Sequence, residues 1–83
     1  MTESDKLDAI FRVALGLPDD VELGGAAYGR TEGWDSVGHM ELTVGIEAAF
    51  GISIDADDVF AMSDYAAVRQ ILRDRYAIQL QDR

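Results

Sequence analysis

The residues best suited to chemistry lie between Gly33 and Gly38, where the only tryptophan of the chain precedes an Asp-Ser pair. Asp35 is a good helix N-cap, because its carboxylate can accept hydrogen bonds from the free amides of a first helical turn. Ser36 then becomes the first helical residue, with its hydroxyl in solvent beside the positive end of the helix dipole. Free amides and the dipole both favour an anion, so an exposed serine there can hold a phosphate group. The alternative is an ordinary helix cap without any chemistry.

The segment that follows Ser36 has the apolar period of a helix, which we expect to run to Phe50 and to end at Gly51. Its apolar residues recur at spacings of three and four and so share one face: Leu42, Ile46, Ala49 and Phe50. This helix positions the serine, and the remaining elements must cover its apolar face.

Three further helices are predicted from capping signals and apolar spacing. The first covers residues 4–15, a short one covers 54–60 with Asp55 as its cap, and the last covers 64–76 with Ser63 as its cap. A long glycine-rich loop, residues 17–34, joins the first helix to the central one. The sequence therefore predicts one all-α domain over residues 1–83: three principal helices plus one short helix, with residues 78–83 as a frayed tail.

One shared apolar interior is expected between these helices. Its predicted members come from the central, short and last helices: Leu42, Ile46, Phe50, Val59, Val68 and Leu72. At 83 residues, the chain is long enough for one small core but not for a core and a large catalytic cleft.

The composition excludes several classes of protein. Without cysteine, the chain has no disulfide, no thiolate metal site and no nucleophilic thiol of its own. The net charge of −9 argues against nucleic acid and anionic membranes as partners. The polar, acidic N-terminus is unlike a targeting peptide, and no apolar run approaches membrane-spanning length. We expect a soluble cytoplasmic protein, and nothing in the sequence demands more than a monomer.

Two catalytic patterns around the serine are incomplete. Residues 34–38 half match the Gly-x-Ser-x-Gly turn of serine hydrolases, but Trp34 replaces the first glycine and no strand precedes it. A triad of Asp35, Ser36 and His39 would lie within one helical turn, without a separate group to orient the imidazole. We therefore expect a protein without enzymatic activity, with His39 as an exposed surface residue.

The acids at residues 55–58 only partly match a calcium loop. Val59 and Phe60 stand at the fifth and sixth positions, where such a loop needs a ligand and a glycine. We interpret these acids as helix-capping residues and expect no metal site.

The order of these features closely resembles the acyl carrier protein family. The resemblance runs from the first helix through Ser36 to Leu72, and it is strongest over Trp34–Leu42 and Phe50–Ile54. It implies that Ser36 carries a 4′-phosphopantetheine arm and that Asp35 assists the attaching transferase, with magnesium as a possible aid. Val37 replaces the leucine that usually follows the serine. The residues flanking the Asp-Ser pair look more like stand-alone carriers of specialised biosynthetic pathways than like the housekeeping fatty-acid carrier.

The same resemblance implies a cargo held as a thioester and a set of partner enzymes. Fatty acyl, polyketide, aminoacyl and hydroxy-acid units remain open as cargo, and a helical adaptor that never receives the arm remains the alternative function. No lysine or arginine occurs between Arg30 and Arg69, whereas eight acids do. We therefore expect partners with basic docking patches. The predicted contact surface on the central helix is apolar in the middle and acidic at the edge: Val37, Met40, Glu41, Val44 and Glu47.

Overall fold

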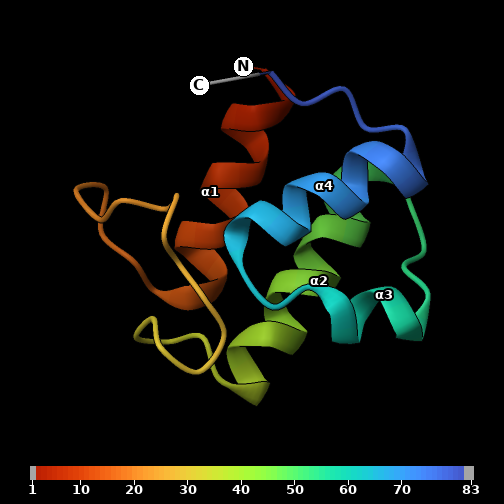
Figure 1. The fold of residues 1–83 in the computed structure, drawn as a ribbon. Coiled ribbons are helices and arrows are strands. Elements are labelled where there is room, and N and C mark those ends of the chain that lie inside the picture. Colours follow the sequence, from red (N-terminus) through yellow and green to blue (C-terminus); the bar gives the residue numbers. More distant parts are fainter. Residues whose placement is uncertain (1, 82–83) are drawn as a thin grey trace.

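The computed structural model describes residues 2–81 and contains four helices in that range. They are α1 (Glu3–Leu15), α2 (Ser36–Phe50), α3 (Ala56–Ala61) and α4 (Tyr65–Tyr76). Figure 1 shows α1 beside α2, with α4 crossing in front of them and the short α3 connecting to α4. The predicted all-α architecture, with three principal helices, one short helix and a long loop, is confirmed.

Local capping explains where the longer helices begin and end. The Thr2 hydroxyl accepts the Asp5 amide at 3.0 Å, and the Asp5 carboxylate accepts the Thr2 amide in return at 3.3 Å. The Asp35 carboxylate caps α2, which stops at Gly51 in the left-handed conformation (φ 66°). These bounds of α2 are the predicted ones.

The core is built around the indole of Trp34, which lies 1% exposed against the ring of Phe11. The buried cluster combines residues of α1, the loop, α2 and α4, and it includes Leu7, Phe11, Leu15, Leu23, Leu42, Ile46, Met62, Tyr65, Val68 and Leu72. The loop is fastened to the start of α4, because Ala26 accepts the Tyr65 amide and Ser63 accepts the Tyr28 amide, both at 2.9 Å. A long loop is therefore compatible with so small a domain.

Some predicted details of the core are wrong. Ala49 is exposed and Phe50 only half-buried, because the face of α2 that meets α1 follows Leu42 and Ile46 instead. Val59 is also only half-buried.

The caps of the two shorter helices differ from the prediction as well. Asp64, rather than Ser63, caps α4 by accepting the Ala67 amide at 2.7 Å. Asp55 occupies the N-cap position of α3 but makes no capping hydrogen bond with its side chain.

The segment expected to fray from residue 78 is packed as far as it is described. Leu80 is buried in the core, and the Gln81 carbonyl accepts hydrogen bonds from the Ser4 hydroxyl and from Arg69, both at 2.7 Å. This contact fastens the end of the described chain to the start of α1. Residues 82 and 83 of the predicted tail lie outside the described residues.

Candidate functional site

Ser36 is the first residue of α2, and its side chain is exposed to solvent. Asp35 precedes it in an extended conformation, and its Oδ1 accepts the amide of Gly38 at 2.9 Å. The first amides of a helix have no intrahelical acceptor, so this turn presents an electropositive end to an anion on the serine. The geometry that we predicted for the Asp-Ser pair is present.

Two glycines allow close backbone contacts just before the Asp-Ser pair and in the first turn of α2. Gly33 has φ +86°, and a Cβ there would lie 2.1 Å from the Leu15 carbonyl oxygen. A Cβ on Gly38 would lie 2.0 Å from the carbonyl oxygen of Gly33. The end of α1, the loop and the start of α2 are therefore in backbone contact, which fixes the Asp-Ser pair relative to the core.

His39 is half-buried and bonded at both ring nitrogens, in contrast to the exposed residue that we predicted. Its Nδ1 accepts the indole N–H of Trp34 at 2.9 Å, and its Nε2 lies 2.8 Å from the Val59 carbonyl oxygen. With both nitrogens engaged in this way, the imidazole is not placed as a base for Ser36.

A hollow of about 450 Å³ opens between α2 and α3, directly beside Ser36. Most of its wall is apolar, and it is lined by Tyr28, Ser36, His39, Met40, Thr43, Val59, Phe60, Met62 and Ser63. The arrangement thus combines an exposed hydroxyl at a helix N-terminus with an apolar recess next to it. Such a site is suited to holding a tethered group.

Comparison with known proteins finds relatives that are described as acyl carrier proteins. The chain is 36% identical over 53 residues to acyl carrier protein 1, chloroplastic, of Casuarina glauca, and 37% identical over 51 residues to acyl carrier protein 2, chloroplastic, of Hordeum vulgare. These matches cover 64% and 61% of this chain. The chain is therefore similar to acyl carrier proteins over somewhat more than three fifths of its length.

The matched region is short relative to the full length of these relatives. They cover 39% and 40% of the two relatives, so the chain spans about two fifths of the length of the curated proteins that it matches. No family model matches the chain, and no solved structure matches it.

Four of the five residues predicted to contact partners lie on the outer side of α2. Val37, Met40, Glu41 and Val44 are exposed. Glu47 differs: it is half-buried, and its Oε2 accepts the Ile54 amide at 2.8 Å, which ties the end of α2 to the segment before α3.

Two aromatic residues extend the same surface and were missed in the sequence. Phe60 on α3 is 85% exposed, and Tyr28 in the loop is 46% exposed; both line the hollow beside Ser36. A six-residue helix has too few turns for its outward face to be read from spacing, and an aromatic residue in a loop carries no period. No sequence pattern therefore indicated that either side chain would be exposed at this surface.

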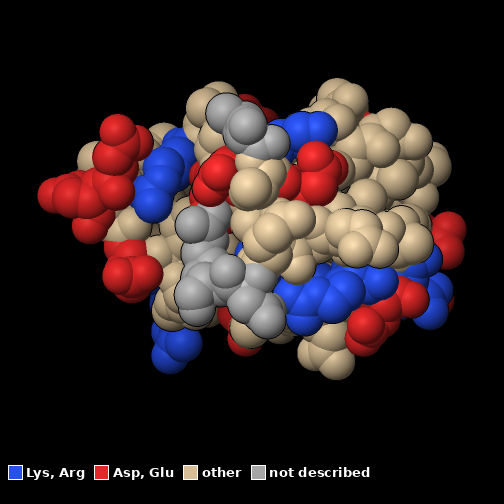
Figure 2. Space-filling model, turned by 90° about the horizontal axis from the view of Figure 1, so that it is seen from above, with Lys and Arg blue, Asp and Glu red and all other residues tan. Residues whose placement is uncertain are grey.

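Lysine and arginine are absent from the two helices that form this surface. Figure 2 views the molecule from the end opposite the start of α2, and there lysine and arginine side chains lie among acids. The stretch between Arg30 and Arg69 contributes none of them and includes all of α2 and α3. The helices α2 and α3 beside Ser36 accordingly carry acidic side chains and no basic ones.

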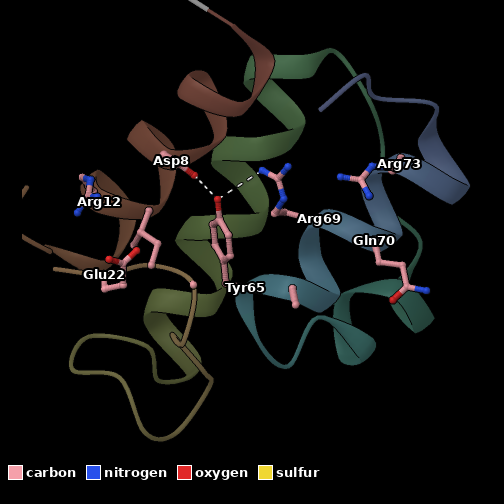
Figure 3. A pocket seen from close by; sticks show the side chains of 10 residues that line it. Asp8, Arg12, Glu22, Tyr65, Arg69, Gln70 and Arg73 are labelled. Atoms are coloured by element: carbon pink, nitrogen blue, oxygen red, sulfur yellow. Dashed lines mark hydrogen bonds between the residues drawn. The ribbon is translucent and has the colours of Figure 1, made fainter. Parts of the chain in front are cut away.

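A second hollow, of about 730 Å³, lies between α1, the loop and α4 (Figure 3). Inside it, the Tyr65 hydroxyl donates to Asp8 at 2.5 Å and accepts from Arg69 at 3.4 Å. Burial, followed by the hydrogen bond to Asp8, raises the pKa of Tyr65. This network joins α1 to α4 and serves the fold.

A cluster of metal-ligating side chains and a membrane-spanning helix are both absent from the part of the chain that the structure describes. Residues 2–81 hold no group of three or more metal-ligating side chains. None of the four helices has the length and apolar character to cross a membrane.

Proposed function

We propose that this domain carries acyl or related biosynthetic intermediates as thioesters on a 4′-phosphopantetheine arm attached to Ser36. The observation that supports the proposal most is the exposed Ser36 at the N-terminus of α2, in a chain that is similar to acyl carrier proteins. The domain itself performs no catalysis; it is modified by a phosphopantetheinyl transferase and then presents its cargo to other enzymes.

The residues present fit the arm. The Ser36 hydroxyl is accessible for a phosphodiester, and the first-turn amides of Ser36 and Val37 favour the negative charge of the phosphate. Asp35 uses Oδ1 for the cap, which leaves Oδ2 to assist the transferase. When attached, the arm supplies the thiol that a cysteine-free chain lacks.

The arm is useful because it keeps the acyl group close to the docked enzyme. An acyl group on a short flexible arm reaches a high effective concentration at whichever enzyme docks the domain. The hollow beside Ser36 is large enough and apolar enough to shelter part of such a group between visits.

The partners that suit this surface are enzymes with basic patches around a small apolar contact. Val37, Met40 and Val44 supply the apolar part on the carrier, and Glu41 supplies acid at its edge. A cytoplasmic location, a monomeric state and a role in a specialised pathway remain predictions; the relatives are named as chloroplastic proteins.

Attachment is tested by intact mass after incubation with coenzyme A and a broad-specificity transferase. The wild-type chain should gain one phosphopantetheinyl group, and Ser36→Ala should gain none while its helical circular dichroism is unchanged. Ser63→Ala is the matched control, because Ser63 is a second exposed serine in the wall of the same hollow. It should be modified like the wild type.

Two outcomes would contradict the assignment. A wild-type chain that gains no mass beside an active transferase would favour the unmodified adaptor. A Ser36→Ala chain that still gains mass would place the arm on another residue.

A further inference from the structure

We propose that His39 is a positioning residue that ties α3 to the loop before α2 and so fixes the shape of the hollow beside Ser36. The inference rests on the proposed function, because the shape of the hollow matters only if Ser36 carries a group that can enter it. It assigns a role to the only histidine of the chain.

The first half of the tie satisfies a buried donor. Trp34 is 1% exposed, so its indole N–H needs a partner inside the protein, and Nδ1 of His39 accepts it at 2.9 Å. The two rings also lie nearly parallel, 20° apart in plane with centroids 6.2 Å apart. His39 thus holds the residue that immediately precedes the Asp-Ser pair.

The second half of the tie joins α2 to α3. Because Nδ1 accepts, the neutral imidazole carries its proton on Nε2, and this N–H donates to the Val59 carbonyl oxygen of α3 at 2.8 Å. One tautomer therefore satisfies both contacts at once. Val59 lies 20 residues away in the chain, so the contact joins two separate helices.

The short helix α3 depends on such contacts. Six residues are too few for a helix that is stable alone, so tertiary contacts must hold α3 in place. Asp58 anchors it to α4 through Tyr76 and Arg75, and within residues 2–81 the His39–Val59 contact is the hydrogen bond that joins it to α2. Residues on both sides of that contact form the wall of the hollow. Loss of the contact should leave α3 free to move away from α2.

Two substitutions separate the halves of the tie. In His39→Asn, the side-chain oxygen takes the place of Nδ1 and can accept from Trp34, but nothing reaches Val59. In His39→Gln, the longer amide takes the place of Nε2 and can donate to Val59, but Trp34 loses its acceptor. His39→Ala removes both contacts, and Met40→Ala alters the wall of the hollow without touching either.

The readouts are two NMR signals of the unmodified chain. The amide of Val59 in α3 should exchange with solvent about three- to tenfold faster in His39→Asn and His39→Ala, relative to the Ile46 amide of α2, and should keep its wild-type rate in His39→Gln. The single indole N–H of Trp34 should move upfield in His39→Gln and His39→Ala and remain near its position in His39→Asn. Met40→Ala should change neither signal.

Parallel changes would overturn the inference. If both signals respond to every His39 substitution in proportion to global stability, His39 is a packing residue; if neither responds to His39→Ala, the tie does not exist. Both measurements use the chain without its arm, and Ser36 is intact in every variant. Failure of the tie is therefore distinct from failure of the proposed function, which would appear as a wild-type chain that gains no mass.

Discussion

Asp58 is a buried carboxylate whose partners hold α3 against α4. The residue is 6% exposed, and its Oδ2 accepts the Tyr76 hydroxyl at 2.6 Å and the Arg75 Nε–H at 2.8 Å. The hydrogen bond from Tyr76, and then that from Arg75, hold the pKa of Asp58 below its usual range, although burial opposes them. This acid, which we interpreted as a capping residue, is instead a tertiary anchor.

The lowered pKa predicts a specific dependence of stability on pH. The folded state favours the ionised carboxylate, so Asp58 contributes its full stabilisation above its ordinary pKa of about 4 and loses it as the pH falls through the lowered folded pKa. Asp58→Asn should therefore lower the melting temperature at pH 7, and the gap to the wild type should narrow below about pH 4.

Thermal unfolding at pH 7 and at pH 3 measures this gap. Asp57→Asn is the matched control, because Asp57 is the exposed acid next to it on α3. It should melt close to the wild type at both values. A gap for Asp58→Asn that stays constant between the two pH values would show that the charge of Asp58 is not what stabilises α3.

The roles of single residues were predictable only where their partners are close in the chain. The capping role of Asp35 and the position of Ser36 as the first residue of α2 were predictable because a cap and its helix are neighbours. His39 and Asp58 could not, because Val59 and Tyr76 lie 20 and 18 residues away from them. Only the tertiary arrangement of α2, α3 and α4 brings those groups together.

At the scale of elements, α2 shows which features of a helix can be read from sequence. Its ends were predictable, since Asp35 and Gly51 are local signals. The exact buried face was not, because α2 packs against α1 through Leu42 and Ile46 and leaves its last turn partly in solvent. There the half-buried Phe50 ring packs against the edge of the core, and the ammonium group of Lys6 lies over it, 5.0 Å from the ring centroid.

This difference predicts unequal costs for truncating two residues of α2. Ile46→Ala should lower the free energy of unfolding by about 2–5 kcal/mol, because the Ile46 side chain is fully buried. Phe50→Ala should cost only about 1–2 kcal/mol, since part of the ring already contacts water. Urea denaturation of both variants gives the comparison, and equal losses would mean that Phe50 belongs to the core after all.

At the scale of the whole molecule, charge is divided between two regions. The chain carries sixteen acids and seven bases, and the stretch containing α2 and α3 holds no base. Complementary charge of this kind accelerates encounter with a basic enzyme and helps to select it. The exposed apolar residues around Ser36 then supply a short-range contact that can form and break quickly.

The docking surface is best tested at Glu41, because Glu47 is unsuitable. Reversal of Glu47 would also remove the acceptor of the Ile54 amide, so folding and docking would change together. Glu41 is exposed on α2, one residue from Met40, and Glu41→Lys should change folding by no more than about 0.5 kcal/mol. Asp20→Lys is the matched control, an exposed acid in the loop after α1 with the same change of net charge.

Glu41→Lys should lower the kcat/KM of modification by a basic transferase several-fold, whereas Asp20→Lys should leave it nearly unchanged, because only Glu41 lies on α2, the helix that begins at Ser36. Raising the ionic strength should slow modification of the wild type and close the gap to Glu41→Lys, since exposed charges are screened over about 8–10 Å in moderate salt. Initial rates from the mass assay, at low and high salt, provide the measurement.

Equal effects of the two reversals would mean that net charge alone guides the encounter. Rates that respond to neither reversal nor salt would mean that the acids serve only solubility, and the docking surface would then be refuted while the assignment of Ser36 stood.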